Sequence, residues 1–260
     1  MVFSVITVCF NAGDKLKETV LKTLGQRFDD FEIIVKDGGS TDNSLASLPS
    51  DEKIKVLSEK DRGIYDAMNR AVANAKGDYV CFMNCGDSFY DEEVLRKTAE
   101  VIKQFPGKGI YYGDAFFCKT GEVISQPSEI TESICYRHMP NHQSCFFDRH
   151  LWDDDEFDLV YKIRADYDFF LRCYFEKSIR PKYLGITVAS YEGGGYSETK
   201  ENRELDKTEH RSVVVKYMGV KKANHYRRMM RLTLQPLRTW IAQKSVFAGL
   251  YNRIKKVIQR

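Results

Sequence analysis

The chain has 260 residues, of which 43% are hydrophobic and 13% aromatic, which is enough apolar material for a core and too much for a disordered segment. No apolar run approaches the roughly 18–20 residues that a membrane-spanning helix needs. The seven cysteines are an odd number without a CxxC pair, and the first residues lack the basic start of a secretory signal. We therefore expect a cytoplasmic protein with free thiols.

The formal net charge of +3 is distributed unevenly along the chain. Residues 221–260 contain eleven Lys or Arg and no Asp or Glu, which leaves residues 1–220 with a net charge of −8. A basic tail on an acidic body is typical of a segment that meets an anionic surface. A solvated C-terminal helix is the simpler interpretation.

Apolar runs alternate with amphipathic stretches through the first 190 residues. Continuous apolar runs predict strands buried on both faces, and apolar residues at helical spacing predict helices between them. We expect strands at 2–9, 31–35, 53–58, 79–84, 109–114 and 183–191, helices at 14–26, 64–75, 91–104 and 164–177, and a hairpin with a loop at 115–135. Short βα units of this kind predict an α/β domain whose mostly parallel central sheet is flanked by helices.

The basic tail is expected to form a helix from Pro236, where a missing backbone donor costs nothing. Trp240, Phe247, Tyr251 and Ile254 would share its apolar face. A cationic, aromatic amphipathic helix is typical of an interfacial membrane helix, although it could also dock on the protein's own core or on a partner.

Polar residues follow three of the predicted strands: Asn11, Asp37 and the segment 84–87. In open α/β sheets ligands bind beyond the carboxyl ends of the strands, so we expect the site there. No G-x-G-x-x-G follows the first strand and no G-x-x-x-x-G-K-[ST] occurs, which argues against dinucleotide binding and a P-loop.

Several acidic residues could carry chemistry at this edge of the sheet. Asp87 ends a buried strand and could hold Mg²⁺ together with substrate phosphates, or could simply cap the next turn. Asp166 and Asp168 open a predicted helix and cannot both point the same way, so at most one is expected to be catalytic. A lone histidine such as His142 is more often structural than catalytic.

Long blocks of the sequence resemble the family 2 inverting glycosyltransferases, which have the GT-A fold. The blocks are SVITVCFNAGDKLKETVLKTLGQRFDDFEIIVKDGGSTDNS, SEKDRGIYDAMNRAVANAKGDYVCFMNCGD, NHQSCFFDRH, RADYDFFLR and GGGYS, and they extend over about residues 2–200. The chain is most similar in character to small bacterial transferases of exopolysaccharide and O-antigen assembly, including the colanic acid type. The resemblance implies a GT-A domain over residues 1–215. The basic amphipathic helical tail over 216–260 lies outside it and is expected from charge and periodicity alone.

The resemblance also implies roles for individual residues. The nucleotide-sugar donor would be bound by Thr7, Phe10, Asp37, Asp61, Asp66, Asn69 and Asn84. Asp166 would be the catalytic base and His142 would lie on the acceptor side. Asp87 would bind Mg²⁺ or Mn²⁺, but Gly86 stands where the family has its first metal-motif carboxylate, so the metal would rest on one Asp.

These expectations combine into one predicted function. The chain would move a sugar from a nucleotide-sugar to a lipid-linked or saccharide acceptor in bacterial surface polysaccharide synthesis, with a divalent cation at the leaving phosphates. It would work at the inner face of the plasma membrane as a peripheral protein that binds anionic lipid through its tail. The alternative is a non-catalytic module that binds sugar nucleotides or membrane, and no nucleic-acid partner is expected.

Overall fold

The computed structural model describes residues 1–193, 199 and 202–232. The chain divides into two compact units, Met1–Val213 and Val214–Arg260. Within the described ranges, no helix is both long enough and apolar enough to cross a bilayer.

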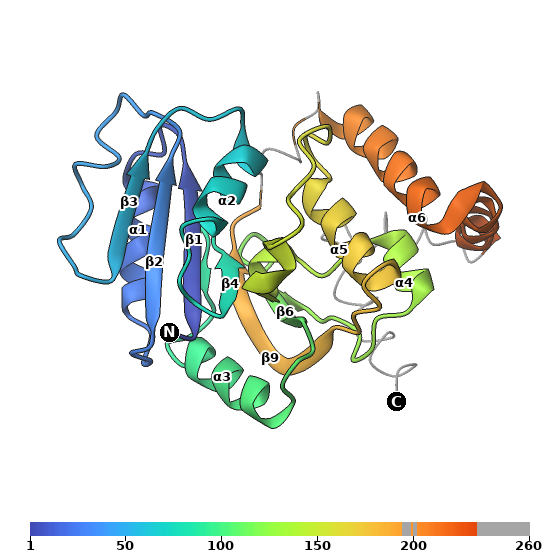
Figure 1. Ribbon diagram of the computed structural model, residues 1–260, viewed down its shortest axis with the longest axis horizontal. Helices are drawn as coiled ribbons and strands as arrows, with labels where there is room; N and C mark the ends of the chain where they lie inside the picture. The colour runs from blue at the N-terminus through green and yellow to red at the C-terminus, as the bar shows by residue number, and fades with distance from the viewer. Residues whose placement is uncertain (194–198, 200–201, 233–260) are drawn as a thin grey trace. The chain divides into compact units, whose positions relative to one another are not determined.

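A central sheet organises the first unit (Figure 1). Among the described residues it has nine strands, in the order β3-β2-β1-β4-β8-β6-β9-β5, with β7 paired to β6. The strands are β1 Phe3–Cys9, β2 Phe31–Asp37, β3 Ile54–Ser58, β4 Tyr79–Phe82, β5 Ser88–Phe89, β6 Ile110–Phe117, β7 Glu122–Ile124, β8 Cys145–Asp148 and β9 Lys182–Tyr191. Strands β3, β2, β1 and β4 are mutually parallel, and β8 is antiparallel to both β4 and β6, so β6 and its parallel neighbour β9 run with the first four. The mostly parallel sheet is confirmed.

Helices connect the strands and cover the sheet. They are α1 Asp14–Leu24, α2 Ile64–Val72, α3 Val94–Gln104, α4 Glu132–Arg137, α5 Ala165–Phe175 and α6 Asn202–Leu232, with short 3₁₀ helices at His142–Ser144 and Arg149–Trp152. Helix α6 bends at Gly219, whose φ is 72°.

Strand β1 is buried on both faces, as its continuous apolar run predicts. Alternate residues of a strand point to opposite faces, and Phe3 and Val5 join one core cluster with Leu16 and Val20 of α1. Helix α2 packs on β1 and β2 but contributes nothing to that cluster, so it covers the other face. The two helices thus cover opposite faces of the sheet at β1 and β2.

The predicted helices and long strands are confirmed with shifts of a few residues at their ends, as is the hairpin formed by β6 and β7. Strands β5 and β8, helix α4 and the start of α6 at Asn202 were not predicted from the sequence. The predicted boundary at residue 215 falls inside α6 and stays a prediction. The helix expected from Pro236, with Trp240, Phe247, Tyr251 and Ile254, lies outside the described residues.

Candidate active site

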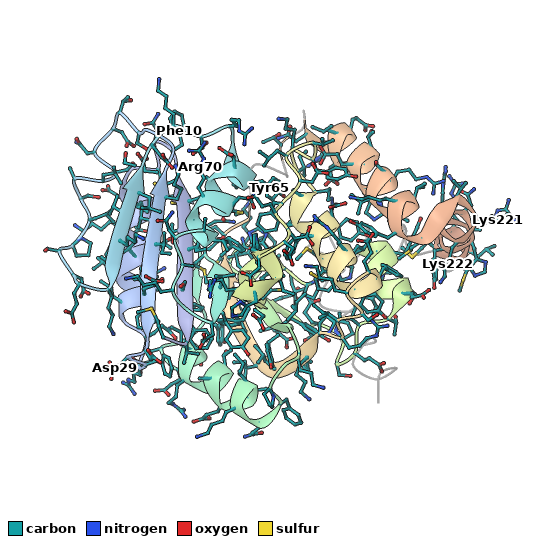
Figure 2. The ribbon with its side chains drawn as sticks, in the orientation of Figure 1. Phe10, Asp29, Tyr65, Arg70, Lys221 and Lys222 are labelled. Carbon is teal, nitrogen blue, oxygen red and sulfur yellow. The ribbon has the colours of Figure 1, made fainter. Side chains whose placement is uncertain are left out.

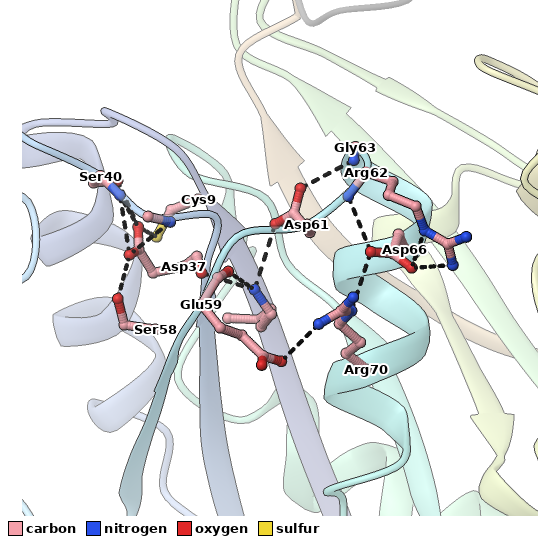
Figure 3. A network of polar contacts seen from close by, with 12 residues as sticks. Cys9, Asp37, Ser40, Ser58, Glu59, Asp61, Arg62, Gly63, Asp66 and Arg70 are labelled. Atoms are coloured by element: carbon pink, nitrogen blue, oxygen red, sulfur yellow. Dashed lines mark hydrogen bonds and ion pairs between the residues drawn. The ribbon is translucent and has the colours of Figure 1, made fainter.

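The turn after β2 is organised by the buried carboxylate of Asp37 (Figure 3). The carboxylate accepts hydrogen bonds from the amides of Gly39 and Ser40, at 3.0 and 3.1 Å, and from the Ser58 hydroxyl at 2.7 Å. Burial alone would raise the pKa of Asp37, but these hydrogen bonds outweigh it and lower the pKa below its ordinary value. Asp37 therefore stays ionised and fixes the turn at the end of its strand.

A cavity of about 670 Å³ opens at the end of β1, and we call it the Phe10 cavity. Figure 2 shows Phe10 beyond the end of β1 and Tyr65 on α2. The Phe10 side chain is 65% exposed, which is unusual for a ring of this size and leaves a flat face on which a planar group could stack. Asp61 and Asp66 also line this cavity.

Both aspartates are held by cations (Figure 3). Asp66 pairs with Arg62 at 2.8 Å and with Arg70 at 3.0 Å. Burial would raise the pKa of Asp66, and the arginines more than offset this, so its pKa lies below the ordinary value. Asp61 lies 3.4 Å from the ammonium of Lys36, which is completely buried, and accepts a hydrogen bond from the amide of Gly63 at 3.0 Å.

A second cavity, of about 610 Å³, lies beside the start of α5, and we call it the Asp166 cavity. A chain of side-chain hydrogen bonds crosses its wall. The amide nitrogen of Asn84 lies 3.0 Å from His142 Nε2, and His142 Nδ1 lies 3.1 Å from Asp166 Oδ2. An amide nitrogen can only donate, so this arrangement places the His142 proton on Nδ1, which donates to Asp166.

Asp166 is kept ionised although its side chain is largely buried. Burial would raise its pKa, but the hydrogen bond from His142 and the charge of Arg164 outweigh burial and lower the pKa. The Tyr65 hydroxyl lies 3.0 Å from Asp166 Oδ1, and burial together with Asp166 raises the pKa of Tyr65 well above its ordinary value, so Tyr65 remains a donor. Asp168 is fully buried and pairs with Arg172, so Asp166 is the carboxylate of this pair that reaches the cavity.

Asp87 occupies another wall of the Asp166 cavity. It accepts hydrogen bonds from Gln143 Nε2 at 2.7 Å and from the amide of Glu192 at 3.2 Å, and burial raises its pKa. The neighbouring Gly86 has a φ of 94°, a conformation that a side chain rarely adopts. Glu192 is engaged with Lys15 at 2.6 Å.

Of these residues, Asp87 could hold a divalent cation if ligand oxygens complete the coordination shell. In the described part of the chain there is no group of three His, Cys, Asp or Glu that could hold a metal. A single carboxylate can suffice for Mg²⁺ or Mn²⁺ when phosphate oxygens and water complete the shell. Asp87 meets that condition, because each of its oxygens accepts one hydrogen bond and keeps further lone pairs, and a cation would offset the cost of burying its charge.

The two cavities adjoin, because Ile64, Tyr65 and Lys162 line both. The exposed ammonium side chain of Lys162 therefore belongs to the place where they meet. A ligand with a planar group in the Phe10 cavity and a reacting group near Asp166 would pass this cation and Tyr65.

The predicted site residues fall into three groups: those that line the Phe10 cavity, those that line the Asp166 cavity and those that line neither. Phe10, Asp61 and Asp66 line the Phe10 cavity, whereas Asn84, Asp87, His142 and Asp166 line the Asp166 cavity. Thr7, Asp37 and Asn69 line neither: the first two are fully buried, and Asn69 bonds both ways with the backbone of Phe157, at 3.0 and 2.9 Å. The donor roles of all these residues stay predictions.

Sequence reasoning overlooked Tyr65, Gln143 and Lys162. Tyr65 and Gln143 are direct neighbours of residues that were singled out, Asp66 and His142, and this adjacency was the available signal. Nothing in the sequence indicates that Lys162 reaches both cavities.

Solved structures show the same fold. The chain superposes with a TM-score of 0.63 on S. aureus TarS 1-349 in complex with UDP-GlcNAc, at 20% identity over 85% of this chain and 69% of that one. It superposes equally well, at 0.63, on the mannosyltransferase PcManGT from Pyrobaculum calidifontis in complex with GDP-Man and Mn²⁺, at 14% identity over 96% of this chain and 83% of that one. The architecture is the GT-A fold.

Sequence comparisons define the family. The model of glycosyl transferase family 2 matches residues 4–177. A PGL/p-HBAD biosynthesis glycosyltransferase of Mycobacterium tuberculosis is 31% identical over 210 residues, which cover 78% of this chain and 82% of the relative. The putative teichuronic acid biosynthesis glycosyltransferase TuaG of Bacillus subtilis is 30% identical over 138 residues, covering 51% and 54%. The chain belongs to glycosyltransferase family 2 and is a glycosyl-transferring enzyme.

Proposed function

We propose that the protein transfers a sugar from a nucleoside diphosphate sugar to a saccharide or lipid-linked acceptor during synthesis of a bacterial surface polysaccharide. TarS and PcManGT, which share the fold, are complexed with UDP-GlcNAc and GDP-Man. The relatives named above are glycosyltransferases of PGL/p-HBAD and teichuronic acid biosynthesis. Membership of a glycosyltransferase family argues against the alternative of a non-catalytic module.

The observation that carries the proposal is the ionised Asp166 in a cavity that adjoins the Phe10 cavity. An acceptor hydroxyl must lose its proton as it attacks the anomeric carbon, and a positioned carboxylate can accept that proton. One base acting opposite the leaving group gives inversion in a single displacement. His142 donates to one oxygen of Asp166 and would fix its orientation. The Tyr65 hydroxyl lies 3.0 Å from the other oxygen and shares its one proton between Asp166 and the carbonyl oxygen of Ile163.

The donor would lie across both cavities. Its base would stack on Phe10, with Asp61 and Asp66 near the ribose and phosphates, and Thr7, Asp37 and Asn69 would shape the pocket from behind. Lys162, which lines both cavities, would face the diphosphate. Asp87 would hold Mg²⁺ or Mn²⁺, and such an ion supplies charge stabilisation for the leaving diphosphate.

We also propose that the enzyme works at the cytoplasmic face of the plasma membrane. Residues 221–260 are rich in Lys and Arg and contain no acidic residue, so they would be attracted to anionic lipid, where a lipid-linked acceptor would lie. No nucleic-acid partner is proposed.

A panel of UDP- and GDP-sugars tests the donor class, with thermal shift to detect binding and hydrolysis or transfer to detect turnover. For the donor that binds, Asp166→Asn should lower the turnover rate by about 10²–10⁴-fold and leave nucleoside diphosphate affinity nearly unchanged, because it removes the base and keeps its shape. Asp168→Asn, at a residue that lines neither of the two cavities, is the neighbouring variant for comparison. Wild-type turnover in Asp166→Asn would overturn the assignment of the base.

A further inference from the structure

The loop that leads into α5, where Asp166 is the second residue, is contacted by the first turns of α6, which belong to the same compact unit (Figure 1). Glu209 is 6% exposed, and its carboxylate accepts hydrogen bonds from three consecutive backbone amides. Its Oε1 lies 2.8 Å from the nitrogen of Lys162, and its Oε2 lies 2.9 Å from the nitrogens of both Ile163 and Arg164. Helix α5 begins at the next residue, Ala165.

A carboxylate at this place satisfies donors that the fold otherwise leaves without an acceptor. The first amides of a helix and those just before it have no partner within the helix, and Arg164 at the cap position makes no side-chain cap hydrogen bond. Negative charge at a helix N-terminus is also favourable. Glu209 thus caps α5 from another helix.

Two neighbours of Glu209 hold the same loop and the first turn of α5. Asp206 forms a two-pronged ion pair with Arg164, at 2.7 and 3.0 Å. The ring of His210 stacks on Tyr167 with 5.3 Å between centroids, and its Nε2 lies 2.9 Å from the carbonyl oxygen of Tyr136. Tyr167 directly follows Asp166 in α5.

The opposite side of the loop faces the cavity wall. The Tyr65 hydroxyl lies 2.6 Å from the carbonyl oxygen of Ile163 as well as 3.0 Å from Asp166. The amide of Ile163 therefore binds Glu209 while its carbonyl meets Tyr65. Lys162 and Asp166, which bracket this peptide, both line the Asp166 cavity.

We propose that Glu209, assisted by Asp206, is a positioning residue that fixes the Lys162–Arg164 backbone and thereby holds the Asp166 carboxylate where the acceptor hydroxyl reacts. The proposal rests on the proposed role of Asp166 as base. Glu209 lies outside the part of the chain that the family model matches, residues 4–177, so the matched segment supplies the base and α6 supplies its support.

The test compares Glu209→Gln with Glu204→Gln in the full chain. Glutamine keeps the shape but has one acceptor oxygen, and its amide group would face a backbone donor, whereas the Glu204 side chain is 81% exposed on the same helix. With the donor identified by the panel, we expect kcat of Glu209→Gln to fall by about tenfold to a hundredfold, since displacement by about 1 Å has effects of that size. Donor KM should change by less than about threefold, and Glu204→Gln should match the wild type.

A double-mutant cycle separates this proposal from the assignment of the base. If Glu209 acts through Asp166, Glu209→Gln should cause little further loss of kcat in the Asp166→Asn background. An equal loss in both backgrounds, or wild-type kcat in Glu209→Gln, would overturn the positioning role. Wild-type turnover in Asp166→Asn alone would instead overturn the proposed base.

A spectroscopic measurement makes the test independent of turnover. Nitrogen-15 NMR of the imidazole should show His142 protonated on Nδ1 in the wild type and a smaller Nδ1–H population in Glu209→Gln, because Asp166 is its acceptor. Unchanged His142 signals would count against the proposal. Should Glu209→Gln fail to fold, Asp206→Asn loosens the same loop through Arg164 and should lower kcat by about twofold to fivefold at unchanged donor KM, and wild-type kcat there would overturn it.

Discussion

Asp87 illustrates how a single side chain can depend on a ligand for its charge. Its burial raises the pKa, its two hydrogen-bond donors are neutral, and Gly86 provides no second carboxylate. A cation bound there would favour the ionised form, so metal binding and ionisation of Asp87 should be linked.

Asp87→Ala should therefore abolish the metal dependence of donor binding. We expect Mn²⁺ to raise the affinity of the wild type for the nucleoside diphosphate by about tenfold or more, and to change that of the variant by less than about twofold. Isothermal titration with and without Mn²⁺ measures the difference. Asp91→Ala, on the same segment but outside both cavities, is the matched control, and a metal-dependent gain retained by Asp87→Ala would place the ion on other residues.

The sequence predicted which carboxylates line the Asp166 cavity, but it did not predict which groups contact or support them. Asp87 and Asp166 lie in motifs that resemble a known family, and both line the Asp166 cavity. Gln143 contacts Asp87 from 56 positions away along the chain, and Tyr65 contacts Asp166 from 101 positions away. Glu209 binds the amide of Arg164, 45 positions away, at the residue before the helix of Asp166. Such pairings arise from tertiary packing and leave no periodic signal.

Among the elements, β6 and β9 form the pair that carries the far side of the site. They are parallel, with an irregular register between Tyr112 and Asp114, and Gly113 lies at that irregularity. A Cβ on Gly113 would lie 2.5 Å from the carbonyl oxygen of Ile186, which is backbone and cannot move aside alone. Strand β9 ends at Tyr191, immediately before Glu192, whose amide binds Asp87.

Gly113→Ala should accordingly destabilise the first unit. We expect a loss of about 1–3 kcal/mol in the free energy of unfolding, as for other overpacked sites, measured by urea denaturation. Gly25→Ala is the control, because Gly25 has a φ of −71° and a Cβ there would meet its nearest atoms at 3.5 Å. Equal stability of the two variants would mean that the β6–β9 contact relaxes without cost.

The elements that sequence reasoning missed are short. Strand β5 has two residues and β8 has four, so neither offers enough alternation to distinguish a strand from a loop. Strand β8 lies between β4 and β6 and pairs with both. This pairing depends on the assembled sheet, so the local sequence of β8 does not reveal it. The long buried runs of β1 and β2 were predictable because burial on both faces dictates their composition.

In the whole molecule, the residues proposed for catalysis and those proposed for membrane recruitment belong to different compact units. The first compact unit ends at Val213 and contains both cavities together with Asp206 and Glu209. The eleven Lys and Arg residues of 221–260 all lie beyond it.

A chain truncated after Lys216 should fold and keep its turnover with a soluble acceptor, but it should no longer sediment with anionic liposomes. Each Lys or Arg near such a surface contributes about 1 kcal/mol, so losing even a few abolishes binding that the full-length chain shows at low salt. Neutral phosphatidylcholine liposomes provide the control surface. Unfolding of the truncated chain would mean that the tail supports the fold, and indifference of the full-length chain to anionic liposomes would contradict recruitment.

The hydrogen bonds from residues 162–164 to Glu209 have a consequence for recombining this enzyme with its relatives. A chimera that exchanges only the segment matched by the family model, residues 4–177, would combine residues 162–164 of one parent with helix α6 of the other. Such a hybrid would keep the donor pocket of one parent and still have a low turnover rate, because the loop before Asp166 would lack its matching support. Junctions placed after Val213 keep the loop and its support from one parent, so they mark where modules of this enzyme can be exchanged.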